Sequence, residues 1–287
     1  MLEAVKKYLS LVKFSHTIFA LPFAITGFFL GLRDCPCVNF NILILLVLCM
    51  VFARNAAMAF NRLIDKDYDS ANPRTKNREI PQNRINLSHV KIFIFINIIF
   101  FITATYFINK LCFYLSPVAL LIILGYSYTK RFSFLSHFIL GLGLSLAPIG
   151  SYIAVCNHFN ILGVLLSLSV LFWVSGFDII YALQDIEFDK KSNLKSIPSV
   201  FGFYYSRIAA LSSHIISMGF LIFFSILLSP QSYFLKIGIL IFILLITMQH
   251  YKIRKQKKER INNLFFTYNG MASIIFGIMA SIELYFF

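Results

Sequence analysis

Long apolar segments alternate with short polar ones along almost the whole chain. Segments 42–53, 92–103 and 237–248 carry apolar residues around the entire circumference of a helix, whereas a helix in a soluble core keeps a polar stripe. With their flanks, these segments approach the roughly 20 residues needed to cross ~30 Å of hydrocarbon. The pattern therefore predicts an all-α polytopic membrane protein.

The same pattern divides the chain into about nine spans, which we expect to form a single domain over residues 1–287. Almost no polar residues separate the third span from the fourth, which predicts a tight helical hairpin. The predicted spans are 15–32, 40–63, 90–108, 111–128, 134–155, 161–183, 207–228, 237–251 and 262–285.

The basic residues predict an orientation for these spans. With nine spans, nearly all Lys and Arg fall on one face of the membrane, and only Arg33, Lys110 and Lys236 fall on the other. Since cytoplasmic loops collect Lys and Arg, we expect the N-terminus in the cytoplasm and the C-terminus outside. The formal net charge of +14 then reflects membrane orientation and attraction to anionic lipid, and predicts no nucleic-acid partner.

The composition agrees with this class, because 59% of the residues are hydrophobic and 33 are Phe. The first apolar stretch contains Pro22 and lacks a small-residue cleavage site, so we expect a retained helix and not a signal peptide. The five Cys lack the paired spacing of a zinc site, and the histidines lack ligand spacing. Unpaired thiols are favoured over a bridge between Cys35 and Cys37, which flank a proline.

Two acidic segments share one frame: DKDYD at Asp65 to Asp69 and DIEFD at Asp185 to Asp189. Each follows the inner end of a span, the second and the sixth, and an even number of crossings brings both to the same side. On a continuous helix, Asn61 stacks with the first pair of aspartates at i, i+4 and i+8. Tyr181, Asp185 and Asp189 repeat this arrangement, whereas Asp67 and Glu187 point elsewhere.

Carboxylates spaced at i, i+4 repel one another and therefore call for cations. Mg²⁺ takes one or two carboxylates and completes its shell with water and phosphate oxygens. Two facing acidic rows would thus clamp a diphosphate. Arg54 and Asp178 lie deeper in the spans on the same faces, where charged groups are by default functional or internally paired.

Basic loops follow the acidic segments and supply the complementary charge for phosphate. Arg and Lys are the usual partners of phosphate oxygens, but cytoplasmic loops also collect them for topology, so both explanations stay open. The basic residues concerned are Arg74, Lys76, Arg78, Lys130, Arg131, Lys190, Lys191 and Lys195.

Several of these residues lie in motifs that resemble a known family. The stretch NRLIDKDYDSANPRTKNREIP resembles the first signature of the UbiA family of intramembrane aromatic prenyltransferases, and DIIYALQDIEFDKK is similar to the second. KFSHTIFALPFA and RNAAMAFNR resemble the 4-hydroxybenzoate branch. The matching positions are Asn61, Asp65 and Asp69 in the first signature, Asp178, Tyr181, Gln184, Asp185 and Asp189 in the second, and Tyr126 with Lys130 in the YxxxK element between them.

The resemblance implies nine helices around a central cavity that opens sideways to lipid, with cytoplasmic cap loops at about 64–89 and 184–206. It implies Mg²⁺-dependent transfer of a polyprenyl group from polyprenyl diphosphate to the ring of a hydroxylated aromatic acid, releasing diphosphate, in quinone biosynthesis at a bacterial inner membrane. A 4-hydroxybenzoate-like acceptor fits the signatures best; a naphthoate-type acceptor of menaquinone biosynthesis is the alternative.

The resemblance also implies roles for the matched residues. The catalytic set would be Asp65, Asp69, Asp185 and Asp189, and these four together with Asn61 would bind the metal. The substrate-binding set would be Asn61, Arg54, Arg74, Arg78, Tyr126, Lys130, Asp178, Tyr181 and Gln184. Arg54 would bind the aromatic carboxylate, or else pair with Asp178 or a neighbouring helix. Asp178 would form part of the active-site wall or a structural pair. Arg74 and Arg78 would close over the substrate.

A cation transporter is a remote alternative, because intramembrane acids also mark ion paths. The acidic segments stop at the inner ends of two spans, however, and spans such as 238–247 carry no charge toward the outer face. A purely structural membrane protein would leave both acidic segments unexplained. The sequence therefore favours the enzyme.

Overall fold

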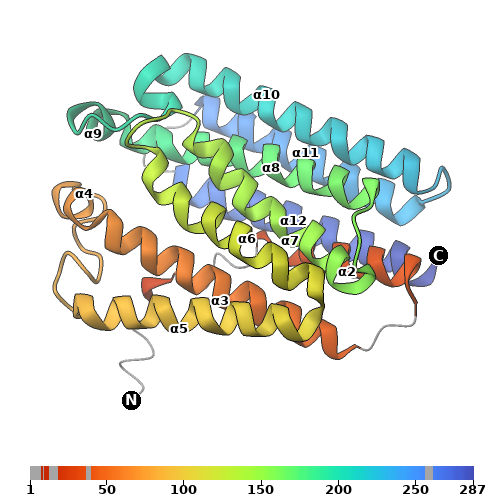
Figure 1. The fold of residues 1–287 in the computed structure, drawn as a ribbon. Coiled ribbons are helices and arrows are strands. Elements are labelled where there is room, and N and C mark those ends of the chain that lie inside the picture. Colours follow the sequence, from red (N-terminus) through yellow and green to blue (C-terminus); the bar gives the residue numbers. More distant parts are fainter. Residues whose placement is uncertain (1–7, 9, 13–18, 37–39, 256–260) are drawn as a thin grey trace.

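The computed structural model describes residues 8, 10–12, 19–36, 40–255 and 261–287, and these form helices and their connections (Figure 1). The helices are α2 (Leu21–Asp34), α3 (Asn41–Ile64), α4 (Lys66–Ala71), α5 (Leu87–Ile108), α6 (Lys110–Thr129), α7 (Ser136–Cys156), α8 (Ile161–Ala182), α9 (Ile186–Lys191), α10 (Ile197–Leu228), α11 (Tyr233–Lys255) and α12 (Ile261–Phe286). A short 3₁₀ turn, Leu183–Asp185, joins α8 to α9.

Within the described ranges, eight helical segments are long and apolar enough to cross a membrane, and each matches a predicted span. The first predicted span, 15–32, is the remaining one; it falls partly on residues outside the described ranges, and its described part forms α2. The all-α membrane class predicted from the sequence is confirmed. Large apolar side chains such as Phe95, Leu121 and Ile226 are exposed on the bundle, as expected for contact with lipid.

The second cap loop is shorter than predicted, because α10 begins at Ile197 and not near residue 207. Ser196 and Ser199 form a reciprocal capping box that starts the helix early: each side chain accepts a hydrogen bond from the backbone N–H of the other. Gly202 then adopts φ 77°, which kinks the helix. A helical turn therefore replaces the end of the expected loop.

The bundle places α8 in the interior, packed against α7 and α10, while α3 lies beside α5 and α11 beside α12 (Figure 1). Trp173 on α8 is fully buried among Phe23, Phe177 and Phe242, and its Nε1 donates a hydrogen bond to Asn269 Oδ1 at 3.0 Å. Both short acidic helices, α4 and α9, lie at one end of the bundle, and the C-terminus lies at the other (Figure 1).

A disulfide at the end of the bundle opposite α4 and α9 joins Cys35, after α2, to Cys156 at the end of α7, with the Cα atoms 5.7 Å apart. The expectation of unpaired thiols is therefore wrong for these two residues. The two cysteines are 121 residues apart in the sequence, and only the packing of α2 against α7 brings them together. Cys49 and Cys112 are free thiols, and Cys37 lies outside the described residues.

Candidate active site

Both acidic segments interrupt their helix at the same position. Helix α3 ends at Ile64, Asp65 has φ −91° and ψ 12°, and α4 begins at the next residue. Asp185 ends the 3₁₀ turn with φ −103° and ψ 8°, and α9 begins at the next residue. Both aspartates thus occupy the sparsely populated bridge region of backbone space. The predicted ladder on one continuous helix is wrong in this respect, because the helix breaks at its middle residue.

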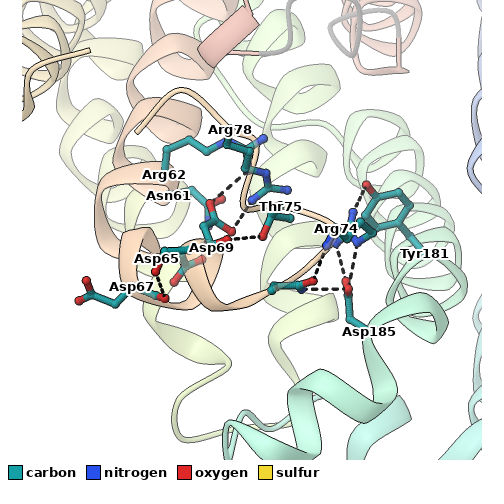
Figure 2. A network of polar contacts seen from close by, with 12 residues as sticks. Asn61, Arg62, Asp65, Asp67, Asp69, Arg74, Thr75, Arg78, Tyr181 and Asp185 are labelled. Atoms are coloured by element: carbon teal, nitrogen blue, oxygen red, sulfur yellow. Dashed lines mark hydrogen bonds and ion pairs between the residues drawn. The ribbon is translucent and has the colours of Figure 1, made fainter. Parts of the chain in front are cut away.

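Most contacts of the first segment are with its own neighbours in sequence (Figure 2), and Arg131 Nη2 also lies 3.5 Å from Asp65 Oδ1. Asn61 Nδ2 donates to Asp65 Oδ2 at 3.0 Å, so the i, i+4 contact survives the break. Asp69 is buried, with its Oδ1 2.6 Å from Arg78 Nη1 and its Oδ2 3.8 Å from Arg62 Nη1. Two arginines therefore compensate one buried carboxylate.

The loop after the first segment also reaches the second one (Figure 2). Arg74 holds Asp185 with two hydrogen bonds, from Nε to Oδ1 at 2.9 Å and from Nη2 to Oδ2 at 2.5 Å. Its Nη1 donates to the Tyr181 hydroxyl at 2.8 Å, and Asn72 Nδ2 donates to Asp185 Oδ1 at 3.2 Å. This bidentate fork ties the two acidic segments together across the bundle.

Both acidic segments line one cavity of about 270 Å³. Gln184 is the exception among the site residues predicted from the sequence, because it is not part of the lining and its Nε2 donates to the Tyr181 carbonyl at 3.2 Å. The predicted residues that line the cavity are Arg54, Asn61, Asp65, Asp69, Arg74, Arg78, Tyr126, Lys130, Asp178, Tyr181, Asp185 and Asp189.

The lining changes character along the cavity. Aspartates, arginines and Lys130 gather at the end near α4 and α9, whereas Leu140, Leu144, Val174 and Phe177 add apolar surface from α7 and α8. An anionic head group and an apolar tail would find complementary surfaces in the same space. The cavity therefore fits an amphipathic ligand.

Closely spaced charged side chains shift the pKa values of Asp65 and Lys130 at the charged end of the cavity. Burial and the neighbouring Asp69 raise the pKa of Asp65 above its usual value, although Lys130 and Arg131 act in the opposite direction. Burial alone would lower the pKa of Lys130, but the carboxylates around it, Asp189 foremost, raise it overall. Lys130 therefore stays protonated as a cation between the two acidic segments.

The donor set fits Mg²⁺ only with help from a ligand. Among the described residues, no three His, Cys, Asp or Glu side chains are grouped to hold a metal ion. Mg²⁺ needs only one or two carboxylates when phosphate and water complete its shell. Asp69 Oδ2 is buried and accepts no hydrogen bond within the described part of the chain, which suits a hard cation. The arginines at Asp69 and Asp185 show that cations are accepted at both segments.

Sequence analysis missed several residues of the site. Arg62 lines the cavity and approaches Asp69 across the helix break at Asp65, so regular helical spacing does not relate the two residues. Ser196 Oγ donates to Asp189 Oδ2 at 2.8 Å, and His137 Nδ1 lies 2.6 Å from Asp178 Oδ2. No local spacing indicates these two contacts, because each joins different elements. Asp178 is thus both part of the wall and paired.

Curated relatives resemble this chain over most of its length. A 4-hydroxybenzoate octaprenyltransferase of Haemophilus ducreyi is 27% identical over 241 residues, covering 83% of this chain and 87% of its own. The enzyme of the same name from Vesicomyosocius okutanii is 28% identical over 253 residues, covering 86% and 90%.

The solved structures show the same fold. A UbiA homolog from Aeropyrum pernix, 28% identical, superposes with a TM-score of 0.83 and covers 92% of this chain and 96% of its own. A UbiA homolog from Archaeoglobus fulgidus bound to DMAPP and Mg²⁺, 20% identical, gives 0.77 and covers 98% and 100%. The family model itself matches residues 20–271, which include both acidic segments and every residue that lines the cavity except Phe19. The chain therefore belongs to the UbiA prenyltransferase family.

Proposed function

We propose that this protein transfers a polyprenyl group from polyprenyl diphosphate to the ring of a hydroxylated aromatic acid and releases diphosphate, with Mg²⁺ as cofactor. The observation that carries the proposal is one cavity that combines both acidic segments with an apolar wall. Four of the basic residues predicted to bind substrate also line it, namely Arg54, Arg74, Arg78 and Lys130. The enzyme works in quinone biosynthesis at a bacterial inner membrane, with its N-terminus in the cytoplasm and its C-terminus outside.

The relatives support the two halves of this reaction. The homolog from Archaeoglobus fulgidus is bound to a prenyl diphosphate and Mg²⁺, which supports the donor and the metal. The relatives named 4-hydroxybenzoate octaprenyltransferase support a hydroxybenzoate-like acceptor. A naphthoate-type acceptor of menaquinone biosynthesis remains the second candidate, because Arg54 in the cavity suits any aromatic carboxylate.

The charged end of the cavity binds the diphosphate. Asn61, Asp65, Asp69, Asp185 and Asp189 would hold Mg²⁺, which would supply positive charge to stabilise the leaving diphosphate. Lys130 and Tyr126 contribute a cation and a hydroxyl from α6 and the residue after it. Arg74 and Arg78, which pair here with Asp185 and Asp69, turn their guanidinium groups to the phosphate oxygens.

The apolar wall governs the fate of the prenyl group. Val174 and Phe177 keep bulk water away from the allylic carbon, which becomes electron-poor as its C–O bond breaks. Phe19 and Phe177 both line the cavity with ring centroids 5.7 Å apart, and their π faces stabilise positive charge. Arg54 holds the carboxylate of the acceptor, so that the electron-rich ring carbon beside the hydroxyl faces the prenyl carbon.

The decisive experiment offers 4-hydroxybenzoate and a carboxylated hydroxynaphthalene side by side to the purified protein, with one polyprenyl diphosphate and Mg²⁺. We expect one prenylated product by mass spectrometry, one diphosphate released for each, and no turnover in chelator. Full activity in chelator, or no product with either acceptor, would refute the proposal. The preferred acceptor decides between the hydroxybenzoate and naphthoate alternatives.

A further inference from the structure

Asp178 and His137 form a pair at the cavity wall that the roles above do not use. Asp178 lies on α8 and lines the cavity, with 21% of its side chain exposed. His137 lies on α7, is fully buried and does not line the cavity. Its Nδ1 is 2.6 Å from Asp178 Oδ2, so His137 reaches the contents of the cavity only through this carboxylate.

The hydrogen bonds of His137 define which nitrogen carries the proton. Its Nε2 lies 3.4 Å from the backbone nitrogen of Ile197, the first residue of α10, whose N–H has no partner within the helix and can only donate. Nε2 therefore presents its lone pair, and Nδ1 carries the hydrogen that is donated to Asp178. Within the described part of the chain, Asp178 Oδ1 makes no hydrogen bond.

Close packing of α7 on α8 fixes this pair. Gly141 lies one turn after His137, and a Cβ there would come within 2.4 Å of the Leu171 carbonyl oxygen and 2.5 Å of Ser175 Oγ. Ser175 Oγ in turn lies between two carbonyl oxygens, 2.7 Å from that of Leu171 and 3.2 Å from that of His137. The imidazole is thus held by backbone and side chain together, which gives Asp178 Oδ2 a defined position.

Asp178 lies between the two ends of the cavity. It precedes Asp185 by seven residues, roughly 10 Å along α8 at ~1.5 Å per residue, on the side of the apolar residues Val174 and Phe177. The diphosphate belongs at the Asp185 end and the prenyl chain against the apolar wall. The carbon that joins them, and the ring that attacks it, therefore belong near Asp178.

We propose that Asp178 accepts the proton that the aromatic ring loses, and that His137 is a positioning residue that holds Asp178 for this step. The inference rests on the proposed function. As the C–O bond breaks, its electron pair leaves with the diphosphate, and a ring π pair forms the new bond to the prenyl carbon. The C–H bond at that ring carbon then breaks, its electron pair restores the aromatic ring, and its proton passes to Asp178 Oδ1.

Two features single out Asp178 for this role. The carboxylates of Asp65, Asp69, Asp185 and Asp189 are assigned to metal and diphosphate, so they are occupied when the ring attacks. Bulk water, the other available base, must be kept away from the allylic carbon. Asp178 has one oxygen anchored by His137 and the other available to the cavity, as a positioned general base requires.

The test compares Asp178→Asn with the intact protein, using 4-hydroxybenzoate that carries deuterium at both ring carbons beside the hydroxyl, or the ring-deuterated hydroxynaphthoate if that acceptor is preferred. We expect product formation to fall about 10²- to 10⁴-fold, as for loss of a general base. A larger deuterium isotope effect than in the intact protein should appear, because proton removal then limits the rate. Slow hydrolysis of the polyprenyl diphosphate by water, measured as diphosphate release without acceptor, should fall far less than product formation. An unchanged isotope effect, or a parallel loss of both activities, would overturn the proposal.

Variants of His137 test the positioning role. His137→Asn keeps a donor near the Nδ1 position, so it should retain much more activity than His137→Leu and show a smaller isotope effect. His214 is the matched control, since it is also fully buried and bonds through Nε2 to the Trp173 carbonyl of α8, outside the cavity. His214→Leu should change stability without changing the isotope effect. Equal behaviour of the three variants would overturn the role of His137.

Failure of this inference is distinguishable from failure of the proposed function. If the proposed reaction is wrong, the intact protein forms no prenylated product at all. If only the role of Asp178 is wrong, the intact protein forms the product and Asp178→Asn shows the same isotope effect as the intact protein. In Asp178→Asn and in the His137 variants, diphosphate release without acceptor reports whether the donor site is folded.

Discussion

The two acidic segments match in sequence and in backbone, yet their carboxylates have different kinds of partner. In the first segment, Asp69 is compensated by arginines, Arg78 from the following loop and Arg62 from α3. In the second, Asp189 accepts a hydrogen bond from a serine, Ser196, and Asp185 is held by an arginine that belongs to the loop of the first segment.

The loops that follow the two segments explain this difference. Both segments are followed in sequence by basic residues and then by Ile-Pro, but only the first loop brings cations, Arg74 and Arg78, into the cavity. Lys190, Lys191 and Lys195 after the second segment are exposed and do not line the cavity. The second loop instead contacts Lys130 through its backbone: the Lys195 N–H donates a hydrogen bond to the Lys130 carbonyl at 2.7 Å. The shared motif therefore specifies a helix break and a pair of carboxylates, and not the counter-ions.

The largest effect should come from the residues that the two segments share. Asp65→Asn and Asp185→Asn each remove one negative charge at the helix break, and we expect each to reduce turnover at least about 10²-fold, as for loss of a transition-state electrostatic group. The measurement is prenylated product by mass spectrometry at saturating donor. Thermal unfolding in detergent serves as the control for folding, since Asp185→Asn also leaves Arg74 without its partner. Full turnover in either variant would mean that one segment alone suffices.

A smaller effect should separate the two loops. Arg74→Gln removes a fork that spans both segments, and hydrogen bonds to charged groups contribute about 1.5–3 kcal/mol, or about tenfold to a hundredfold in turnover. Lys191→Gln, at the exposed end of α9, should stay within about twofold, the range of surface substitutions. Arg74→Lys should fall between them, because it keeps the charge but not the planar fork. Equal losses for Arg74→Gln and Lys191→Gln would contradict the difference between the loops.

The sequence predicts the common features of the two segments well. The spans follow from hydropathy, because a helix in lipid must satisfy its own backbone and be apolar all round. The shared cavity follows from the even number of crossings between Asp65 and Asp185, and all but one of the predicted site residues line it. Charge type and spacing suffice for such features, since they depend on the residues of one helix at a time.

The partners that tie helices together are not predicted, and the reason is physical. Arg74 pairs with Asp185 across 111 residues, and His137 pairs with Asp178 across 41, so both contacts depend on how helices pack. The hydrophobic pattern also does not predict the helix breaks at Asp65 and Asp185, because neither position carries Gly or Pro, the usual signals of a break. Cys35 and Cys156 are a third case, since a helix contact decides their pairing.

A still smaller effect, on stability more than on turnover, should mark the serine of the second segment. Ser196→Ala removes the hydrogen bond to Asp189 and the N-cap of α10, which together should lower the free energy of unfolding by about 1 kcal/mol or somewhat more. The measurement is the midpoint of thermal unfolding in detergent. Ser192→Ala in the same loop is the control, because the Ser192 side chain makes no hydrogen bond within the described residues. A midpoint unchanged by Ser196→Ala would show that Asp189 is held by other groups.

The smallest effect should come from the third acid of each segment, which matches in sequence but not in position. Asp67 is exposed and points away from the network of the first segment (Figure 2), and Glu187 is exposed at the start of α9; neither lines the cavity. Asp67→Asn and Glu187→Gln should therefore each keep turnover within about twofold. Both changes also remove one negative charge from the same end of the bundle as Asp65→Asn does, so they separate a local role of the carboxylate from a general effect of charge. A loss in either variant comparable to that of Asp65→Asn would mean that the whole acidic frame, and not only its first and last positions, acts on the substrate.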